Sequence, residues 1–289
     1  DYGYEVYAEK NSDDEFLLHL FCVDPSRLLQ ERLDRGVASV FFSATLLPVG
    51  YYKDLLCKNE NPYAVYAQTV FDSSQSRIVI AGDVTSRYKK RGEDTYRRYA
   101  KYIYEIIRSH PGNYIAFFPS YKFMDEVELY FTEEAYDLDH SFIRQERGMG
   151  EADKESFLQA FSEDNGGTLI GFCVLGGIFS EGIDLTNDRL IGAIIVGAGL
   201  PQVCNERTIL SEHFENDGFE YAYLNPGMNK VLQAAGRVIR TENDRGIIAL
   251  LDDRFLESQY RRCFPKEWSD ALPVTVDTVG AVIRDFWEK

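Results

Sequence analysis

Three polar side chains in the last quarter of the sequence stand at helical spacing. Gln233, Arg237 and Arg240 are separated by four and then three residues within LQAAGRVIRTENDRGIIALLDD. In a helix these positions share one face and form a polar row about 10 Å long. The opposite face is small and apolar, which suits packing on a sheet. A solvated helix face has the same pattern, so a function for this row depends on the rest of the chain.

The elements that must position this row alternate between strands and helices. Six apolar runs have the length and residue types of strands, namely residues 37–45, 77–82, 113–120, 168–177, 189–199 and 246–253. Most are continuously apolar, which is typical of strands buried on both faces and hence of a parallel sheet. Helical patterns cover residues 95–109, 121–132, 153–161 and 226–240, the last with Asn225 as its N-cap. This order predicts an α/β doubly wound domain.

Ligands of such sheets bind at the carboxyl ends of the strands, where this sequence places small and polar residues. Ser120 follows one predicted strand and is a suitable helix N-cap. The segment LGGIFSEGIDL follows another, and SATLLP follows a third. Glycines and free helix N-termini can hold anions, although each segment singly fits an ordinary turn.

Composition limits the classes of partner. The net charge of −16 argues against a surface that coats nucleic acid, so any nucleic-acid contact must be local. Residues 87–98 carry six basic and two acidic residues, and a phosphate-contact role and a solvated turn fit this window equally well. Five scattered cysteines without C-x-x-C spacing predict a reducing, cytoplasmic location and no metal site in this chain. No apolar run is long enough to span a membrane, so we expect no membrane partner.

Four of these segments, in this order, resemble the C-terminal motor half of the XPD/DinG-type superfamily-two DNA helicases. SATL at residues 43–46 resembles helicase motif III, and AFFPSYKFMDEV at 116–127 resembles motif IV. GGIFSEGIDL at 176–185 resembles motif V, and QAAGRVIR at 233–240 resembles motif VI. The resemblance implies a RecA-like (P-loop NTPase-type) α/β fold, with a mostly parallel sheet and helices on both faces.

The resemblance also implies roles for the polar row. Arg237 and Arg240 would reach the β- and γ-phosphates of an ATP held with Mg²⁺ by the N-terminal helicase half, and Gln233 would align the water or a phosphate. Glu181, Gly182 and Asp184 would lie where the nucleotide and nucleic-acid sites communicate. Asp184 would bind a motif VI arginine or a nucleotide hydroxyl, and a plain turn role fits it as well.

Single-stranded DNA is the other partner that the resemblance implies. Ser120 and Tyr121 would touch its backbone, Ser86 and Arg87 would add a further contact, and Ser43 and Thr45 would couple the nucleotide to the DNA side. For Ser43 and Thr45, helix capping after a strand is an equally valid interpretation.

The chain lacks the G-x-x-x-x-G-K-[ST] phosphate loop, the metal-holding D-E-A-H-like box and the cysteine quartet of the family's iron–sulfur cluster. All three belong to the N-terminal half of such helicases, so an iron–sulfur cluster is compatible with an intact protein but not with this chain. We therefore interpret residues 1–60 as the tail of the first motor domain and 61–289 as the second. The chain alone is then expected not to hydrolyse ATP.

The sequence leaves two alternatives open. A non-catalytic RecA-like module that docks partners would not need Gln233, Arg237 and Arg240 together. A dinucleotide enzyme is suggested by VGAGLPQ at residues 196–202, although Pro201 stands where the helix should begin and the third glycine is missing.

Overall fold

The computed structural model describes residues 3–59, 62–67, 69–162, 166–180 and 185–289. The chain forms two compact units. We call Asp1–Ala67 with Pro201–Pro226 the hairpin unit, and Gln68–Leu200 with Gly227–Lys289 the sheet unit. Residues 201–226 thus group with the N-terminal segment, although the sequence interpretation places them in the second domain. The assignment of helicase domains itself stays a prediction.

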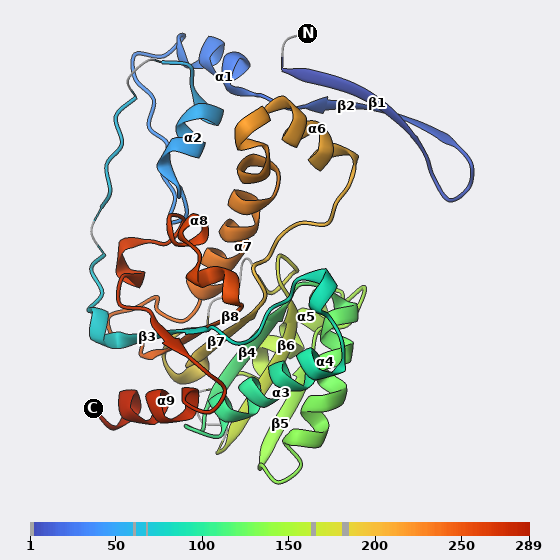
Figure 1. Ribbon diagram of the computed structural model, residues 1–289. Coiled ribbons are helices and arrows are strands. Elements are labelled where there is room, and N and C mark those ends of the chain that lie inside the picture. The colour runs from blue at the N-terminus through green and yellow to red at the C-terminus, as the bar shows by residue number, and fades with distance from the viewer. Residues whose placement is uncertain (1–2, 60–61, 68, 163–165, 181–184) are drawn as a thin grey trace. The chain divides into compact units, whose positions relative to one another are not determined.

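The described part of the sheet unit contains a seven-stranded sheet of order β5-β6-β4-β7-β8-β3-β9, and every pairing in it is parallel (Figure 1). The strands are β3 (Ser76–Ala81), β4 (Asn113–Phe118), β5 (His140–Arg144), β6 (Thr168–Val174), β7 (Gly192–Val196), β8 (Gly246–Leu251) and β9 (Leu272–Val274). Because all strands run the same way, their last residues share one edge of the sheet, the carboxyl edge. Their first residues share the opposite, amino edge. The predicted parallel α/β sheet is confirmed.

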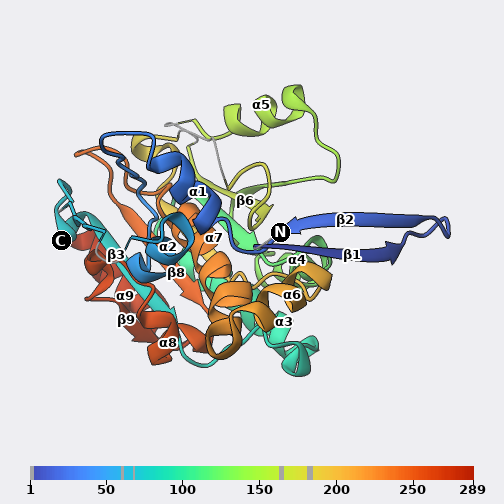
Figure 2. The same cartoon turned by 90° about the horizontal axis from the view of Figure 1, so that it is seen from above.

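Helices cover both faces of this sheet. The helices that follow β3, apart from α6, are α3 (Glu93–Ile107), α4 (Tyr121–Glu134), α5 (Glu151–Gln159), α7 (Asn225–Ala235), α8 (Ser258–Arg261) and α9 (Val279–Glu288). Alternate residues of each strand point to opposite faces. Tyr114, Ala116 and Phe118 of β4 therefore join α3, α4 and α9 in one buried core. On the other face Gly171 of β6 leaves room for Phe157 and Phe161, whose rings a Cβ there would meet at 3.0 and 2.9 Å. Figure 2 shows α5 on the opposite side of the sheet from α3 and α9.

The hairpin unit is built from local pairing and short helices. Strands β1 (Tyr4–Lys10) and β2 (Phe16–Cys22) form an antiparallel hairpin, with Tyr7 stacked on His19 at 4.6 Å between ring centroids. The helices are α1 (Ser26–Leu33), α2 (Val49–Leu56) and α6 (Asn205–His213). Tyr221 donates a hydrogen bond to Asp54 at 2.7 Å, which links α2 to the segment after α6. No helix within the described ranges combines the length and the apolar composition that a membrane crossing requires.

One predicted strand is wrong. Residues 37–45 have strand composition but form no strand, and Val37 and Phe42 are 107% and 90% exposed. A strand is stable only when neighbouring strands satisfy its backbone groups. Among the described residues none pairs with this segment. Composition alone therefore identified an apolar segment but not the partner that would make it a strand.

Candidate functional site

The predicted helix of the polar row ends earlier than expected. Helix α7 stops at Ala235, so Gln233 is helical whereas Arg237 and Arg240 lie beyond its end. The last turn tightens, because the amides of Arg237 and Val238 bond to carbonyls three residues back at 3.3 and 3.2 Å. The prediction of one continuous helical face for the three side chains is therefore wrong.

Asp244 holds the turn that follows α7 and keeps residues 240 and 241 out of the helix. Its carboxylate accepts the backbone N–H groups of Arg240 at 2.6 Å and Thr241 at 2.7 Å, which a continued helix would bond to its own carbonyls. It also accepts the N–H of Asn187 at 2.7 Å. Burial alone would raise the pKa of this carboxyl, but these N–H groups outweigh burial and lower it. The turn after α7 is thus fixed by a side chain that helical periodicity does not register.

The start of α7 also differs from the prediction. Asn225 is not an N-cap, because a π-helical segment (Glu220–Leu224) leads directly into the helix and Asn225 itself has helical dihedral angles. Its side chain is 2% exposed. A buried polar residue inside a helix and a capping residue have the same letter in the sequence, so the pattern could not distinguish them.

Arg237 is half-buried and is held by the loop after β6. Its Nη2 donates to the carbonyl of Ser180 at 3.0 Å. Ser180 is fully buried, and its hydroxyl accepts the Gly176 amide at 2.7 Å. Arg240 is exposed and Gln233 is half-buried. Glu181, Gly182 and Asp184, predicted as nucleotide-site residues, lie outside the described residues.

A buried charged network lies at the carboxyl edge, between the ends of β3 and β8. Asp252 is 0% exposed and accepts two hydrogen bonds at 2.8 Å from Ser86, one from its amide and one from its hydroxyl. Arg254 donates to the two oxygens of Asp252 at 2.7 and 2.8 Å and also to the Ser86 hydroxyl. Burial would raise the pKa of Asp252, but these hydrogen bonds and the arginine charge lower it. Ser86 is only 5% exposed, and its two hydrogen bonds to Asp252 hold this loop. Its nucleic-acid contact stays a prediction.

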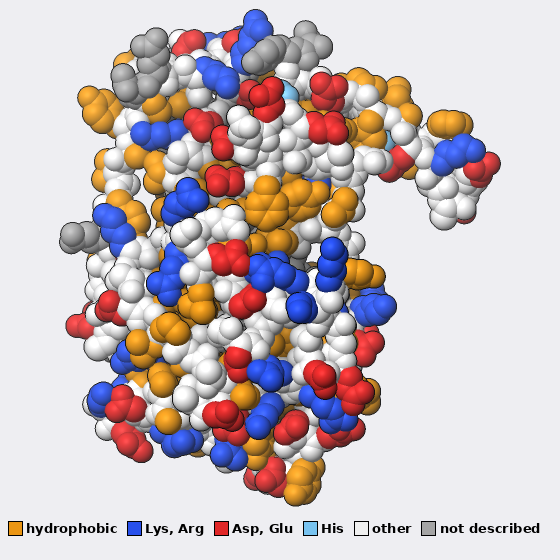
Figure 3. All heavy atoms as spheres, in the orientation of Figure 1, with side chains coloured by type: hydrophobic (Ala, Val, Ile, Leu, Met, Phe, Trp, Pro, Cys, Tyr) orange, Lys and Arg blue, Asp and Glu red, His pale blue; other side chains and the backbone are white. Residues whose placement is uncertain are grey.

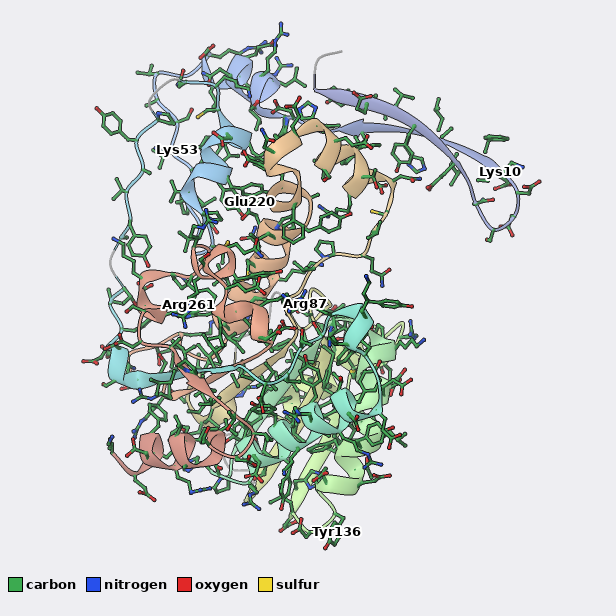
Figure 4. The ribbon with its side chains drawn as sticks, in the orientation of Figure 1. Lys10, Lys53, Arg87, Tyr136, Glu220 and Arg261 are labelled. Atoms are coloured by element: carbon green, nitrogen blue, oxygen red, sulfur yellow. The ribbon has the colours of Figure 1, made fainter. Side chains whose placement is uncertain are left out.

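The network supports a basic turn. Arg87 forms ion pairs with Asp253 at 2.9 Å and with Glu257, and Figure 4 labels it on the turn that joins β3 to α3. The next residue, Tyr88, is 84% exposed and begins a short 3-10 helix, η2 (Tyr88–Lys90). Lys89 and Lys90 are exposed as well, and the guanidinium of Arg91 lies 5.6 Å from the Tyr88 ring centroid. Blue Lys and Arg side chains gather over this turn in Figure 3.

The N-terminal end of α4 lies beside this turn, because Arg91 also lies 5.3 Å from the ring of Phe123. Ser120 caps α4 by accepting the Phe123 amide at 3.2 Å, which confirms the predicted cap. Tyr121 is half-buried, and Arg147 lies 4.4 Å from its ring centroid. Its hydroxyl accepts a hydrogen bond from Gln145 at 2.8 Å. An aromatic face, cations and a helix N-terminus thus occur together at the carboxyl edge, a combination suited to bases and phosphates.

Ser43 and Thr45 lie in the hairpin unit. Their hydroxyls are 3.3 Å apart, and the Thr45 amide donates to the Ser43 hydroxyl at 3.2 Å. Both residues take part in a local turn rather than in a helix cap. The predicted coupling role of these two residues stays a prediction.

Comparison with known proteins identifies the family to which the chain belongs. The model of the family described as "Helicase C-terminal domain" matches residues 103–271, more than half of the chain. The chain belongs to this family. The matched residues include all of α4, β6, β7, α7 and β8, but not Ser86, Arg87 or η2.

Two curated relatives share the resemblance. The chain is 30% identical to "ATP-dependent DNA helicase XPD" of Sulfolobus acidocaldarius over 239 residues, which covers 78% of this chain and 41% of the relative. It is 27% identical to "3'-5' exonuclease DinG" of Staphylococcus saprophyticus over 245 residues, which covers 82% of this chain and 26% of the relative. The chain therefore spans less than half the length of these relatives. They are consistent with the C-terminal motor domain of XPD/DinG-type helicases.

A solved structure supports the fold. The XPD apo structure superposes with a TM-score of 0.67 at 22% identity, and the match covers 95% of this chain and 55% of that one. The RecA-like α/β architecture expected from the motifs is confirmed at the level of the fold.

In this helicase C-terminal domain, the sequence did not reveal four residues that organise the site. Gln145 and Arg147 follow β5, whose sequence HSFIR mixes polar and apolar residues and so lacks the pattern of a buried strand. Their signal lay in position: in a parallel sheet, polar residues directly after any strand face the ligand edge. Asp252 and Arg254 belong to the DDRF segment, which the sequence showed without indicating that its first and third residues form a buried ion pair.

Proposed function

We propose that the chain is the C-terminal half of an ATP-dependent DNA helicase. In this proposal Arg237 and Arg240 are arginine-finger residues for an ATP·Mg²⁺ site completed by the N-terminal half, and Gln233 aligns the attacking water or a phosphate. Family membership supports the class of protein. The contact that anchors Arg237 on the Ser180 carbonyl supports its role, because it holds the guanidinium beside the loop after β6, at the edge of the sheet where ligands of parallel sheets bind.

Phosphoryl transfer needs positioning and positive charge more than covalent chemistry, and an arginine finger contributes roughly 10³–10⁵ in rate. This corresponds to about 4–7 kcal/mol of transition-state stabilisation. The exposed Arg240 and the half-buried Arg237 fit the charge of a triphosphate. Glu181, Gly182 and Asp184 would complete the nucleotide side. An iron–sulfur cluster, where the intact protein carries one, would belong to the N-terminal half.

The same proposal assigns part of a single-stranded DNA track to the carboxyl edge. Ser120 and Tyr121 contribute a helix N-terminus and an aromatic face, and Arg147 and η2 contribute charge. These contacts address phosphates and base faces, so binding at this edge is independent of sequence. Ser86 and Arg87 act here by holding η2 in place as well as by any contact of their own.

Exposed apolar residues in the hairpin unit support the N-terminal half as the partner. Val37, Val40 and Phe42 are exposed in a segment of strand composition. We expect this segment to join the sheet of the N-terminal half as a strand, which would bring Ser43 and Thr45 to the coupling position of motif III. Residues 1–60 are then the tail of the first motor domain.

Phosphate release tests whether ATP hydrolysis needs both this chain and an N-terminal half. This chain alone should hydrolyse no ATP above background, and the chain joined to an N-terminal half with a phosphate loop should turn over with single-stranded DNA present. Robust turnover by the chain alone would show that the active site lies elsewhere.

Arg237→Ala tests the finger. In the joined protein we expect turnover to fall by roughly 10³–10⁵ with little change in thermal stability. The matched control is Arg261→Ala, because Arg261 is an exposed arginine on α8 outside the candidate site. Equal turnover of the two variants would remove Arg237 from catalysis.

A docking module without catalysis is the second candidate. The exposed apolar side chains of β2, Phe16, Leu18 and Leu20, favour protein contacts of this unit. The two functions separate in the joined protein, because a pure docking module would bind its partner and show no ATP turnover that depends on Arg237.

A further inference from the structure

Gln145 joins two strand ends through both ends of its side-chain amide. Its Nε2 donates to the Tyr121 hydroxyl at 2.8 Å, and its Oε1 accepts the Val174 amide at 3.0 Å. Its own backbone amide donates to Phe172 at 2.8 Å. The residue is 4% exposed. A buried amide used at both ends cannot rotate without losing both contacts, so the position of Tyr121 and the start of the loop after β6 are tied together.

The loop carries this tie onward to Arg237. The Gly177 amide donates to the Val174 carbonyl at 2.9 Å, and a Cβ on Gly177 would stand only 3.0 Å from Gln145 Nε2. Ser180, fully buried, accepts the Gly176 amide and offers its carbonyl to Arg237 at 3.0 Å. Every member of this series, from Tyr121 to Arg237, lies in the sheet unit and within the described residues.

The two ends of the series are the ones that ligands would reach. Tyr121 is half-buried and stacks with the exposed Arg147, so a base or phosphate can contact its ring edge or the guanidinium. Arg237 is half-buried, so part of its side chain is open to solvent, and its Nη2 is held by the Ser180 carbonyl at the carboxyl edge. Gln145 touches neither ligand and lies between the two sites.

We propose that Gln145 is a positioning residue that couples nucleic-acid contact at Tyr121 to the placement of Arg237 through Val174 and Ser180. The inference rests on the proposed function, since it presumes that Tyr121 meets nucleic acid and Arg237 meets a phosphate. A strand of nucleic acid that engages Tyr121 and Arg147 shifts the tyrosine hydroxyl, and Gln145 transmits the shift because its amide is held at both ends. The Ser180 carbonyl, which accepts a hydrogen bond from Arg237, then moves and shifts the guanidinium of Arg237 with it.

Gln145→Met is the deciding variant, because methionine keeps the length of the side chain and removes both hydrogen bonds. Gln75→Met is the matched control. Gln75 also bridges two chain segments, donating to the carbonyls of Glu242 and Asp244 at 2.8 Å, but it does so at the amino edge. Both variants lose a bridging amide. A decrease in the response to DNA that both variants share would therefore reflect lost structure, whereas a decrease confined to Gln145→Met would reflect the lost positioning of Arg237.

Three readouts use a labelled 20-nucleotide oligo-dT. Anisotropy measures its affinity for the chain, and hydrogen exchange measures the protection that it gives to residues 174–180. The third readout is the ratio of ATP turnover with DNA to turnover without DNA in the joined protein. In Gln145→Met we expect the DNA-induced protection to disappear and the ratio to fall about five-fold. Gln75→Met should keep both at the wild-type level.

Tyr121→Phe gives an independent check if Gln145→Met folds poorly, since it removes the same hydrogen bond from the accessible end and keeps the ring. We expect it to lower the ratio about as much, and the double variant to lose no more than either single one. Tyr104→Phe is the control, because its hydroxyl contacts only Asp137 and Arg108 among the described side chains.

The outcomes separate the inference from the function on which it rests. If the wild-type chain binds no oligo-dT, the nucleic-acid role of the carboxyl edge fails and the inference fails with it. If the wild type binds DNA and is stimulated by it, but Gln145→Met keeps the wild-type ratio and protection, only the inference is overturned. Additive losses in the double variant would also overturn it.

Discussion

The two edges of the sheet use polar side chains in different ways. At the amino edge, Gln75, Asn113 and Asp244 bond to backbone groups, for example Asn113 to the carbonyl of Ser162 at 2.7 Å. At the carboxyl edge, side chains bond to backbone groups and also to one another, as in the contacts of Arg254 with Asp252 and of Gln145 with Tyr121. The amino edge thus closes loops, whereas the carboxyl edge builds networks.

The difference indicates where function can reside. A side chain that bonds to backbone fixes one loop, and its loss is felt mainly as lost stability. A network of side chains connects several loops, so a change at one end can alter the position of a group at the other. Ser86, Asp252 and Arg254 hold the loops after β3 and β8 in this way, and the basic η2 turn depends on them.

The largest effect should come from breaking the carboxyl-edge network. Arg254→Met leaves the fully buried Asp252 without its cation. We expect a loss of about 3–5 kcal/mol in the free energy of unfolding, because removing one partner of a buried pair leaves an uncompensated charge. Urea denaturation at pH 7 measures it.

Arg98→Met is the control for that variant. Arg98 pairs with Asp83 at 3.1 Å after β3, but its side chain is 47% exposed. Exposed pairs contribute about 0–1 kcal/mol. If the two variants lose equal stability, the buried pair does not stabilise the carboxyl edge more than an exposed pair does.

Asp244→Asn should have the next largest effect and tests the amino edge. The amide nitrogen of Asn cannot accept one of the three N–H groups that Asp244 now accepts, so we expect a loss of about 1–3 kcal/mol at pH 7. The folded state lowers the pKa of Asp244 below its usual 3.8. Its contribution is therefore present above pH 3.8 and is lost as the pH falls through the folded pKa.

Urea titrations of wild type and Asp244→Asn from pH 3 to pH 7 measure this dependence. The stability gap between the two proteins should narrow below pH 3.8. A gap that stays constant over this range would show that the carboxylate charge is not what holds the turn.

Much of the fold followed from residue type and period. The five buried strands of the sheet were predicted because runs such as IIALL must be covered on both faces. The edge strand β5 was missed because HSFIR mixes polar with apolar residues, and the edge strand β9 was missed because LPV is only three residues long and contains a proline. The segment 37–45 was predicted as a strand for its composition, but pairing requires neighbours that composition does not specify.

The candidate site was harder to predict, because its geometry depends on contacts between distant residues. Helical spacing placed Arg237 and Arg240 on one face, whereas Asp244, four residues beyond Arg240, ends that geometry. Ser120 was predicted correctly because capping is local. The position of Gln145 after β5 was a signal, but its two partners could not be predicted, since they stand 24 and 29 residues away in the sequence.

Ser120→Ala tests a single position of the carboxyl edge, the N-cap of α4. Loss of the cap should cost about 1 kcal/mol, whereas Thr132→Ala in the same helix should be close to neutral. Ser120→Gly should cost only a few tenths of a kcal/mol. If Ser120→Gly still weakens oligo-dT binding, the hydroxyl contacts nucleic acid. If binding is unchanged, Ser120 serves the helix alone.

The smallest expected effect lies beside the amino edge, at His110. Its ring stacks on Trp287 of α9 with 4.1 Å between centroids, and Arg245 lies 5.3 Å from the Trp287 ring. Burial, and then the charge of Arg245, lower the pKa of His110 below its usual 6.5, while Asp188 acts in the opposite direction. The unfolded chain therefore binds a proton more readily than the folded chain, and stability falls as the pH drops below 6.5.

His110→Phe keeps a ring on Trp287 and removes the titration. We expect the variant to lose less stability than wild type between pH 7 and pH 5, as urea midpoints at each pH would show. Added salt should reduce the difference, because it screens the charge of Arg245. Parallel pH profiles for the two proteins would mean that His110 does not contribute, and that the amino edge gains its stability from hydrogen bonds to backbone alone.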